Sequence, residues 1–208
     1  MTTEIESLIH IQKDLLKPAA QMLARAFYDD PFSAYLFPEQ KDRERKLPYM
    51  HKNLLRFGML YGEAYATSDE LEGIATWMPP GNFKITLWRG IRCGGISMLL
   101  KVGWGALKKL SSYGRHVTPL HRQLDRFNPW YLSILAVDPE FRGKAFVSRL
   151  FEPMLKIFDS TDQYCFLETN KERNVPMYEH FGFKMIEKLP IPDTDLTTWM
   201  MLREPKAI

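Results

Sequence analysis

The stretch Ile134-Leu-Ala-Val-Asp-Pro-Glu-Phe-Arg-Gly-Lys-Ala-Phe-Val-Ser-Arg-Leu150 decides the fold class of this chain. Its apolar first part is typical of a buried strand, and the residues after the Asp-Pro turn have the spacing of an amphipathic helix that begins near Arg142. The start of such a helix presents free backbone N–H groups, which suit a pyrophosphate. Arg142 and Lys144 add positive charge there. From these residues alone, an ordinary strand-to-helix turn with solvated basic side chains is an equal alternative.

The rest of the chain alternates strand and helix patterns around this unit. We expect strands at residues 8–12, 63–68, 71–78, 130–137, 164–169, 183–189 and 197–203, and helices at 18–28, 43–61, 142–159 and 174–180. Residues 82–128 interrupt the strand pattern, and we expect two short helices there. This alternation predicts a mixed α/β (α+β) sheet in a single domain over residues 1–208.

The composition is that of an ordinary globular protein without unusual partners. Hydrophobic residues make up 45% of the 208 residues, and the net charge of +3 is too small to predict binding to nucleic acid. The cysteines, Cys93 and Cys165, show no metal-ligand spacing and are too few for a disulfide framework. The start of the chain lacks a signal-peptide pattern, and no apolar run approaches the ~20 residues of a membrane span. We therefore expect a cytoplasmic protein without metal, membrane or nucleic-acid partners.

A second motif lies downstream, at Asn174-Val-Pro-Met-Tyr178-Glu-His-Phe-Gly182-Phe183. Together with the turn from Arg142 to Val147, it resembles the GNAT superfamily of acetyltransferases. The acyl-CoA motif of that family reads Gln/Arg-x-x-Gly-x-Gly/Ala, and its second signature places a tyrosine before Gly-Phe. The segments Ala26-Phe-Tyr-Asp-Asp-Pro31, Ala75-Thr-Trp-Met-Pro-Pro80, Phe166-Leu-Glu-Thr169 and Thr198-Trp-Met200 further resemble its puromycin N-acetyltransferase-like branch.

The resemblance implies a fold and an activity. The fold is a GNAT-like mixed, mostly antiparallel twisted sheet flanked by helices, with a helical insertion near 82–128 over the acceptor pocket. The activity is direct transfer of an acetyl group from acetyl-CoA to an amine of a small molecule. Two positions depart from the acyl-CoA motif: Ala145 stands where glycine is usual, and Val147 where Gly or Ala is usual. Val147 would either crowd the phosphates or point into the core.

By resemblance, the coenzyme site extends from Leu135 to Ser148. The backbone of Leu135, Ala136 and Val137 would pair with the pantetheine arm, and Asn174 would hydrogen-bond the same arm. Tyr178 would protonate the departing thiolate as general acid. The residues around the pyrophosphate would be Arg142, Gly143, Lys144, Ala145, Phe146, Val147 and Ser148.

The general base and the acceptor pocket are less clear from the sequence. Glu168 is either the base or a group that orders Asn174 or a loop amide, and a water relay to a distant carboxylate is equally possible. His51 and His116 are interpreted as structural or surface histidines. The acceptor side would be lined by Asp29 or Asp30 at the end of the first helix, with Phe27, Tyr35 and Trp77 as apolar walls.

Two other classes of protein remain open. One is a non-catalytic GNAT-like module that binds acyl-CoA. The other is a membrane or nucleic-acid adaptor that uses the aromatic and basic residues of segment 88–115. Side chains that snorkel from a half-buried helix explain that segment more simply. An oligomer is possible.

Overall fold

The computed structural model describes residues 7–83 and 86–206, and its strands form one seven-stranded sheet. The strand order is β1-β2-β3-β4-β5-β7-β6. The strands are β1 (Ile9–His10), β2 (Glu63–Ala66), β3 (Gly73–Met78), β4 (Trp130–Val137), β5 (Cys165–Thr169), β6 (Lys184–Pro190) and β7 (Thr197–Arg203). The mixed, mostly antiparallel sheet predicted from the sequence is confirmed, and the extent of the domain over residues 1–208 stays a prediction.

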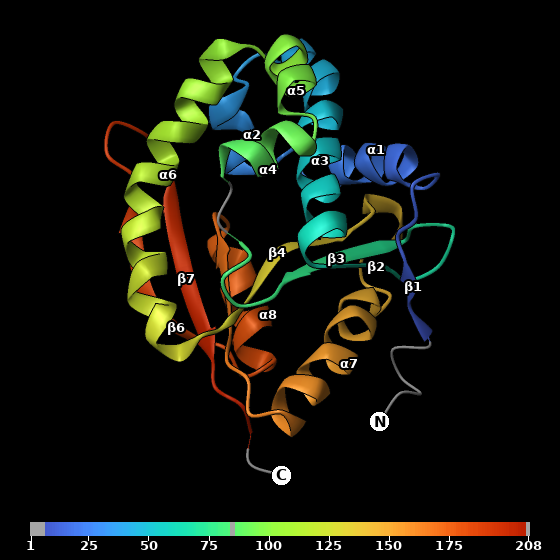
Figure 1. Ribbon diagram of the computed structural model, residues 1–208, viewed down its shortest axis with the longest axis vertical. Helices are drawn as coiled ribbons and strands as arrows, with labels where there is room; N and C mark the ends of the chain where they lie inside the picture. Colours follow the sequence, from blue (N-terminus) through green and yellow to red (C-terminus); the bar gives the residue numbers. More distant parts are fainter. Residues whose placement is uncertain (1–6, 84–85, 207–208) are drawn as a thin grey trace.

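Helices cover both faces of this sheet. Figure 1 shows α7 (Phe146–Ser160) and α8 (Val175–His180) below the strands, with α1 (Leu16–Ala26) and α3 (Gln40–Tyr61) above them. The remaining helices are α2 (Pro31–Leu36), α4 (Leu87–Arg92), α5 (Gly95–Val102) and α6 (Trp104–Leu124), with single 3₁₀ turns η2 (Asp125–Phe127), η3 (Pro139–Phe141) and η4 (Glu172–Asn174). No helix within 7–83 and 86–206 is long and apolar enough to cross a bilayer.

The sheet opens at one place, between β4 and β5. These two strands are parallel, whereas the other neighbouring strands pair in antiparallel fashion. Their pairing covers Trp130 to Leu132 on β4 and Cys165 to Leu167 on β5, although β4 continues to Val137. The two strands therefore separate after Leu132, and the gap faces the start of α7.

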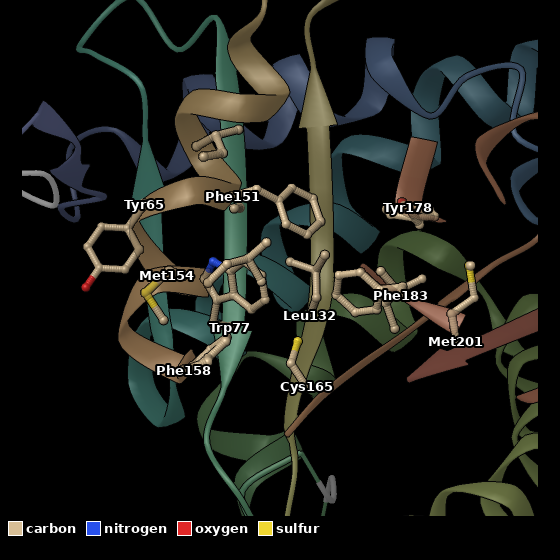
Figure 2. Packing of buried hydrophobic residues seen from close by; sticks show 14 of the residues in the cluster. Tyr65, Trp77, Leu132, Phe151, Met154, Phe158, Cys165, Tyr178, Phe183 and Met201 are labelled. Carbon is tan, nitrogen blue, oxygen red and sulfur yellow. The ribbon is translucent and has the colours of Figure 1, made fainter. Parts of the chain in front are cut away.

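The side chains of β3 point alternately toward α7 on one face of the sheet and toward α3 on the other. Trp77 is fully buried and makes edge-to-face contacts with Phe151 and Phe158 of α7, at centroid distances of 5.5 and 5.4 Å (Figure 2). Because side chains alternate along a strand, its neighbour Thr76 points to the opposite face, where its methyl group lies against Gly58 of α3. Burial of each large aromatic side chain contributes about 1.5–3 kcal/mol.

The helix predicted to begin at Arg142 begins four residues later, at Phe146. Gly143 and Ala145 have φ angles of +78° and +58°, which a right-handed helix does not allow. Arg142 to Ala145 is therefore a loop between η3 and α7. A second difference is α2, where the sequence predicted only the end of the first helix. Asp30 caps α2 by accepting a 3.0 Å hydrogen bond from the backbone N–H of Phe32.

The insertion near 82–128 contains three helices among its described residues, rather than the expected two. Gly94 and Gly103 separate them with φ angles of +96° and +90°. The third helix, α6, is 21 residues long and runs beside the β7 end of the sheet (Figure 1). The insertion therefore reaches the same face of the sheet as α2.

Candidate active site

The gap between β4 and β5 leaves one edge of β4 open. Leu135, Ala136 and Val137 pair with Ala75, Ile74 and Gly73 of β3 on their other side. Toward β5 these residues have no strand partner within the described chain. An extended amide-containing chain can therefore add to this edge by backbone hydrogen bonds.

The start of α7 lies at the end of that edge. The first bond of the α7 ladder runs from Arg149 N–H to Ala145 C=O, at 3.2 Å. The N–H groups of Phe146, Val147 and Ser148 precede it and belong to the first turn, whose donors have no carbonyl four residues back. With the exposed loop from Arg142 to Ala145, this turn is suited to bind an anion.

Both predicted basic side chains of the loop are held by neighbours. The Arg142 guanidinium donates a 3.1 Å hydrogen bond to the backbone oxygen of Ala26 at the end of α1. The Lys144 ammonium lies 5.0 Å from the ring centroid of Phe141. Their charges remain at the loop, although Arg142 is turned toward α1.

The two departures from the acyl-CoA motif lie in different surroundings. Val147 packs against the core cluster beneath α7, so its branched side chain points into the core rather than at the loop amides. Ala145 is exposed and holds the left-handed conformation that glycine adopts without steric cost. The strain at Ala145 is about 1–2 kcal/mol.

Tyr178 lies on α8, at the edge of the same core. Its ring is buried, 6.2 Å from the centroids of Phe151 and Phe183 (Figure 2). Burial and the negative charge of Asp30 raise the pKa of Tyr178 above its usual value. The phenol therefore carries its proton throughout the neutral range, and Asp30 lies within its electrostatic reach.

Glu168, at the end of β5, is held between two aromatic side chains. The hydroxyl of Tyr131 donates a 2.7 Å hydrogen bond to its Oε1, and Nε2 of His121 lies 3.5 Å from its Oε2. His121 Nε2 and Glu168 Oε2 are both buried, and neither has a hydrogen-bond partner in the described part of the chain. Asn174 instead donates to Thr169 Oγ1 at 3.3 Å, so no contact supports a role for Glu168 in ordering Asn174.

His121 was missed by the sequence interpretation, which considered His51 and His116. It lies on α6, and its ring packs edge-on against Phe166 of β5 at 5.3 Å. No local motif surrounds it, so the pairing with Glu168 appears only when α6 folds across the sheet.

Further groups connect Glu168 to Asp30. Lys171 Nζ lies 3.4 Å from Asp30 Oδ2, and burial raises the pKa of Asp30 despite this cation. Burial and then the charge of Glu168 raise the pKa of both Tyr113 and Tyr131. Asp30 adds a smaller effect on Tyr113, and Tyr178 adds one on Tyr131. We call the following set the polar region: Asp30, Tyr113, His121, Tyr131, Glu168, Lys171 and Tyr178.

The three residues predicted as apolar walls belong to different parts of the core. Trp77 faces α7 and is fully buried, so it does not line a pocket. Phe27 stacks on His51 of α3 at 5.1 Å. Tyr35 packs in the same cluster as Tyr113, and its ring lies 6.3 Å from that of Phe32, which is itself 4.6 Å from Tyr113.

No arrangement of three or more His, Cys, Asp or Glu side chains suited to a metal ion occurs within 7–83 and 86–206. Cys93 and Cys165 are both buried free thiols. Cys165 lies in the core of β5, as the apolar run around it predicted.

Comparisons with known proteins identify relatives of this chain and of its fold. No protein-family model matches the chain. It is 28% identical over 212 residues to an uncharacterized N-acetyltransferase of Schizosaccharomyces pombe, with 92% of this chain and 80% of that protein covered. A solved structure described as histone acetyltransferase HPA2 and related acetyltransferase, from Corynebacterium glutamicum, superposes with a TM-score of 0.71 at 18% identity, covering 97% of both chains.

Two other solved structures are insect enzymes. Arylalkylamine N-acetyltransferase 2 of Aedes aegypti has a TM-score of 0.60 at 14% identity, with 96% of this chain and 98% of that chain covered. The polyamine N-acetyltransferase of Drosophila melanogaster, which forms N-acetylagmatine, has a TM-score of 0.56 at 15% identity, with 95% and 98% covered. The seven-stranded sheet that opens between β4 and β5 is thus the GNAT fold. In sequence, the chain is similar to the N-acetyltransferase of fission yeast, and in fold to the solved acetyltransferases.

Proposed function

We propose that this enzyme transfers an acetyl group from acetyl-CoA to the amine of a small molecule, in the gap between β4 and β5. The observation that carries the proposal is the separation of the two strands after Leu132. We propose that the first-turn amides of α7 and the hydroxyl of Tyr178 on α8 act at this opening. The insect neighbours act on arylalkylamines and on agmatine, which supports a small amine as acceptor. We also propose that the chain belongs to the puromycin N-acetyltransferase-like branch.

Acetyl-CoA would bind along the open edge of β4. Its pantetheine arm would pair with the backbone from Leu135 to Val137 and with Asn174, and its pyrophosphate would take the amides from Arg142 to Ser148. The free, correctly oriented N–H groups of the first α7 turn support this placement. The buried free thiols of Cys93 and Cys165 fit a reducing compartment such as the cytoplasm.

In the reaction, the neutral amine nitrogen attacks the thioester carbonyl carbon and the C–S bond breaks. Tyr178 would give its proton to the departing sulfur. The raised pKa of the phenol keeps that proton in place until the C–S bond breaks, and the proton then forms the S–H bond of the free thiol. The attacking nitrogen loses a further proton as it becomes the amide, and solvent would carry a proton from there back to the tyrosinate.

The amine must lose a proton to attack, and we propose that Glu168 with His121 accepts it. Tyr131 already fixes one carboxylate oxygen, which leaves Oε2 and the facing Nε2 of His121 for the ammonium group. The negative charge of Asp30, which acts on Tyr113, would attract the same cation. A buried cluster with two carboxylates and one lysine favours a positively charged acceptor.

The test is an acetylation screen with agmatine, arylalkylamines and other primary amines, with release of free thiol as readout. Tyr178→Phe should lower kcat by about 10²-fold or more, while calorimetry shows unchanged binding of acetyl-CoA. Tyr65→Phe is the matched control, because that hydroxyl lies on β2 beside Glu63, 3.3 Å from its Oε2.

Equal rates in the Tyr178→Phe variant and the unaltered enzyme would disprove the role of Tyr178. Tight binding of acetyl-CoA without turnover on any amine would instead favour an acyl-CoA-binding module. No binding of acetyl-CoA would reject the whole proposal.

A further inference from the structure

The insertion carries large apolar side chains that no other part of the described chain covers. Leu87 and Trp88 of α4 are 78% and 80% exposed, Leu100 of α5 is 78% exposed, and Trp104 at the start of α6 is 73% exposed. We call the following set the insertion face: Leu87, Trp88, Ile91, Ile96, Leu99, Leu100 and Trp104. The expected half-burial of this segment therefore holds for Val102, Ala106 and Tyr113, which are buried, but not for the insertion face.

These residues gather in one part of the molecule. Helix α5 contacts both α4 and α6, and α4, α5 and the start of α6 lie toward the end of the molecule away from both described termini (Figure 1). Within α5, Val102 is buried while Leu100 projects outward. The insertion face is therefore the exposed side of these helices, and α5 packs against α3.

The charge around this face has a single sign. Residues 73–124 contain no Asp or Glu. The basic residues of the three helices are Arg89, Arg92, Lys101, Lys108, Lys109, Arg115 and Arg122. Arg92, Lys101 and Lys108 are exposed near the insertion face, whereas Arg89 bonds Asn82 and Lys109 bonds the backbone oxygen of Tyr35. A surface that combines exposed Trp and Leu with basic residues alone is complementary to the interface of an anionic bilayer.

A pocket adjoins the insertion face and shares its charge. Its volume is about 340 Å³, and it lies between α3 and α5, lined by Arg45, Lys46, Tyr49, Leu100, Lys101, Val102 and Gly103. Asp42 pairs with Arg45 and Lys46 at 2.9 and 2.7 Å, so three cations face one carboxylate. The pocket thus remains positive, and Leu100 belongs to both the pocket and the insertion face.

We propose that the insertion face docks the enzyme on an anionic phospholipid bilayer. The exposed Trp and Leu side chains enter the interface between headgroups and acyl chains, and the basic residues contact the phosphates. The pocket beside Lys101 takes a single anionic headgroup. The contact is peripheral, and it leaves the gap between β4 and β5 on another part of the molecule.

A second copy of this chain suits the surface less well. Pairing two insertion faces would bring two exclusively basic surfaces together, which like-charge repulsion opposes. Nucleic acid would satisfy the charges, but it offers no apolar region for Leu87 or Leu100.

The experiment is co-sedimentation of the whole protein with lipid vesicles. We expect binding to vesicles of phosphatidylcholine mixed with phosphatidylserine that is more than about tenfold tighter than to phosphatidylcholine alone, and that weakens as salt is added. The double variant Trp88→Ser/Leu100→Ser should lose at least about tenfold in affinity. The double variant Lys101→Glu/Lys108→Glu should lose the preference for phosphatidylserine.

The matched control is Met185→Ser/Ile186→Ser, which removes two exposed apolar side chains from β6, outside the insertion. It should bind vesicles as the unaltered protein does, and circular dichroism would verify that each variant is folded. Absence of binding to either vesicle would overturn the proposal, as would unchanged binding of the Trp88→Ser/Leu100→Ser variant. Self-association that this variant abolishes, without vesicle binding, would identify a second copy as the occupant instead.

Discussion

The hydroxyl of Tyr131 and the carboxylate of Glu168 form a 2.7 Å hydrogen bond that links the two strands beside their point of separation. Tyr131 belongs to β4 and pairs in register with Phe166, two residues before Glu168 on β5. The bond orients one oxygen of the carboxylate and turns the other toward His121. Through its contacts with Tyr131 and His121, the Glu168 carboxylate thus connects the sheet opening to the insertion helix α6.

The first prediction concerns this carboxylate. Glu168→Gln should keep the hydrogen bond to Tyr131 but cannot accept a proton, so kcat should fall by about 10²-fold with little change in KM for acetyl-CoA. Steady-state kinetics on an accepted amine would measure both constants. Glu172→Gln is the control, since Glu172 is exposed and pairs with Lys188 on β6. A kcat equal to that of the control would contradict a role for Glu168 in proton transfer.

His121 gives the second prediction. His121→Gln should lower kcat less than Glu168→Gln does, because the carboxylate remains, and it should change the pH profile of kcat. His116→Gln, on the same helix, should leave that profile unchanged. If the two single variants lower kcat equally and the double variant lowers it no further, His121 and Glu168 act as one unit. Full additivity would show that they act separately.

A third prediction follows from the conformation of Ala145. Its φ of +58° costs Ala about 1–2 kcal/mol, whereas glycine adopts it freely and loses part of the gain as chain entropy. Ala145→Gly should therefore raise the free energy of unfolding by about 0.5–1 kcal/mol and lower the Kd for acetyl-CoA. Urea unfolding and calorimetry would test the two effects. Gly143→Ala, at φ +78°, should lower the free energy of unfolding and raise the Kd for acetyl-CoA. A lower Kd in both variants would exclude backbone strain as the cause.

The loop that we propose to bind the coenzyme could be located from the sequence because its motif is local. Arg142, Gly143 and Lys144 are consecutive, and the strand before them is apolar enough to be recognised. The start of α7 was placed too early, since the pattern of apolar residues does not reveal that Gly143 and Ala145 have positive φ. Local motifs therefore identify the loop but not its backbone conformation.

The acceptor side depends on contacts between distant parts of the chain. His121 meets Glu168 across 47 residues, and Asp30 approaches Lys171 only after α2 packs near β5. Trp77 was assigned to the pocket because alternation along β3 does not say which face of the sheet meets α7. Such pairings form only in the three-dimensional fold, and for this reason the identity of the general base could not be predicted from the sequence.

A fourth prediction concerns His51 on α3, which is buried against Phe27. Neither ring nitrogen has a hydrogen-bond partner among the described residues, and burial lowers the pKa of His51 from 6.5 to about 4. Between these two values the unfolded chain binds a proton that the folded chain does not, so stability falls as the pH decreases from about 6.5 to about 4. Lowering the pH from 7.5 to 5.5 should cost about 1 kcal/mol through this group.

Urea unfolding at the two pH values would measure that cost. His51→Leu should remove most of the difference, because leucine has no proton to bind. His116→Leu, on the partly exposed side of α6, is the control and should keep the pH dependence of the unaltered protein. An undiminished pH dependence in His51→Leu would contradict the assignment.

The fifth prediction concerns the ion pair that holds the last strand to α7. Two nitrogens of Arg203 donate to the Asp159 carboxylate at 2.8 and 2.7 Å, and Nε donates to the backbone oxygen of Phe181 at 3.0 Å. Burial alone would raise the pKa of Asp159, but the bonds from Arg203 and Lys206 outweigh it and lower the pKa. The stability from this pair is therefore present above the unfolded pKa near 3.9 and is lost as the pH falls through the lower folded value.

Asp159→Asn should reduce the free energy of unfolding by about 2–3 kcal/mol at neutral pH, since it leaves the almost fully buried Arg203 without its counter-charge. Asp162→Asn, three residues later and outside the helix, is the matched control and should change stability by less than about 0.5 kcal/mol. Because Arg203 also binds Phe181, at the end of the helix that carries Tyr178, the Asp159 variant should lower kcat as well. A destabilised variant with unchanged kcat would show that α8 keeps its position without this ion pair.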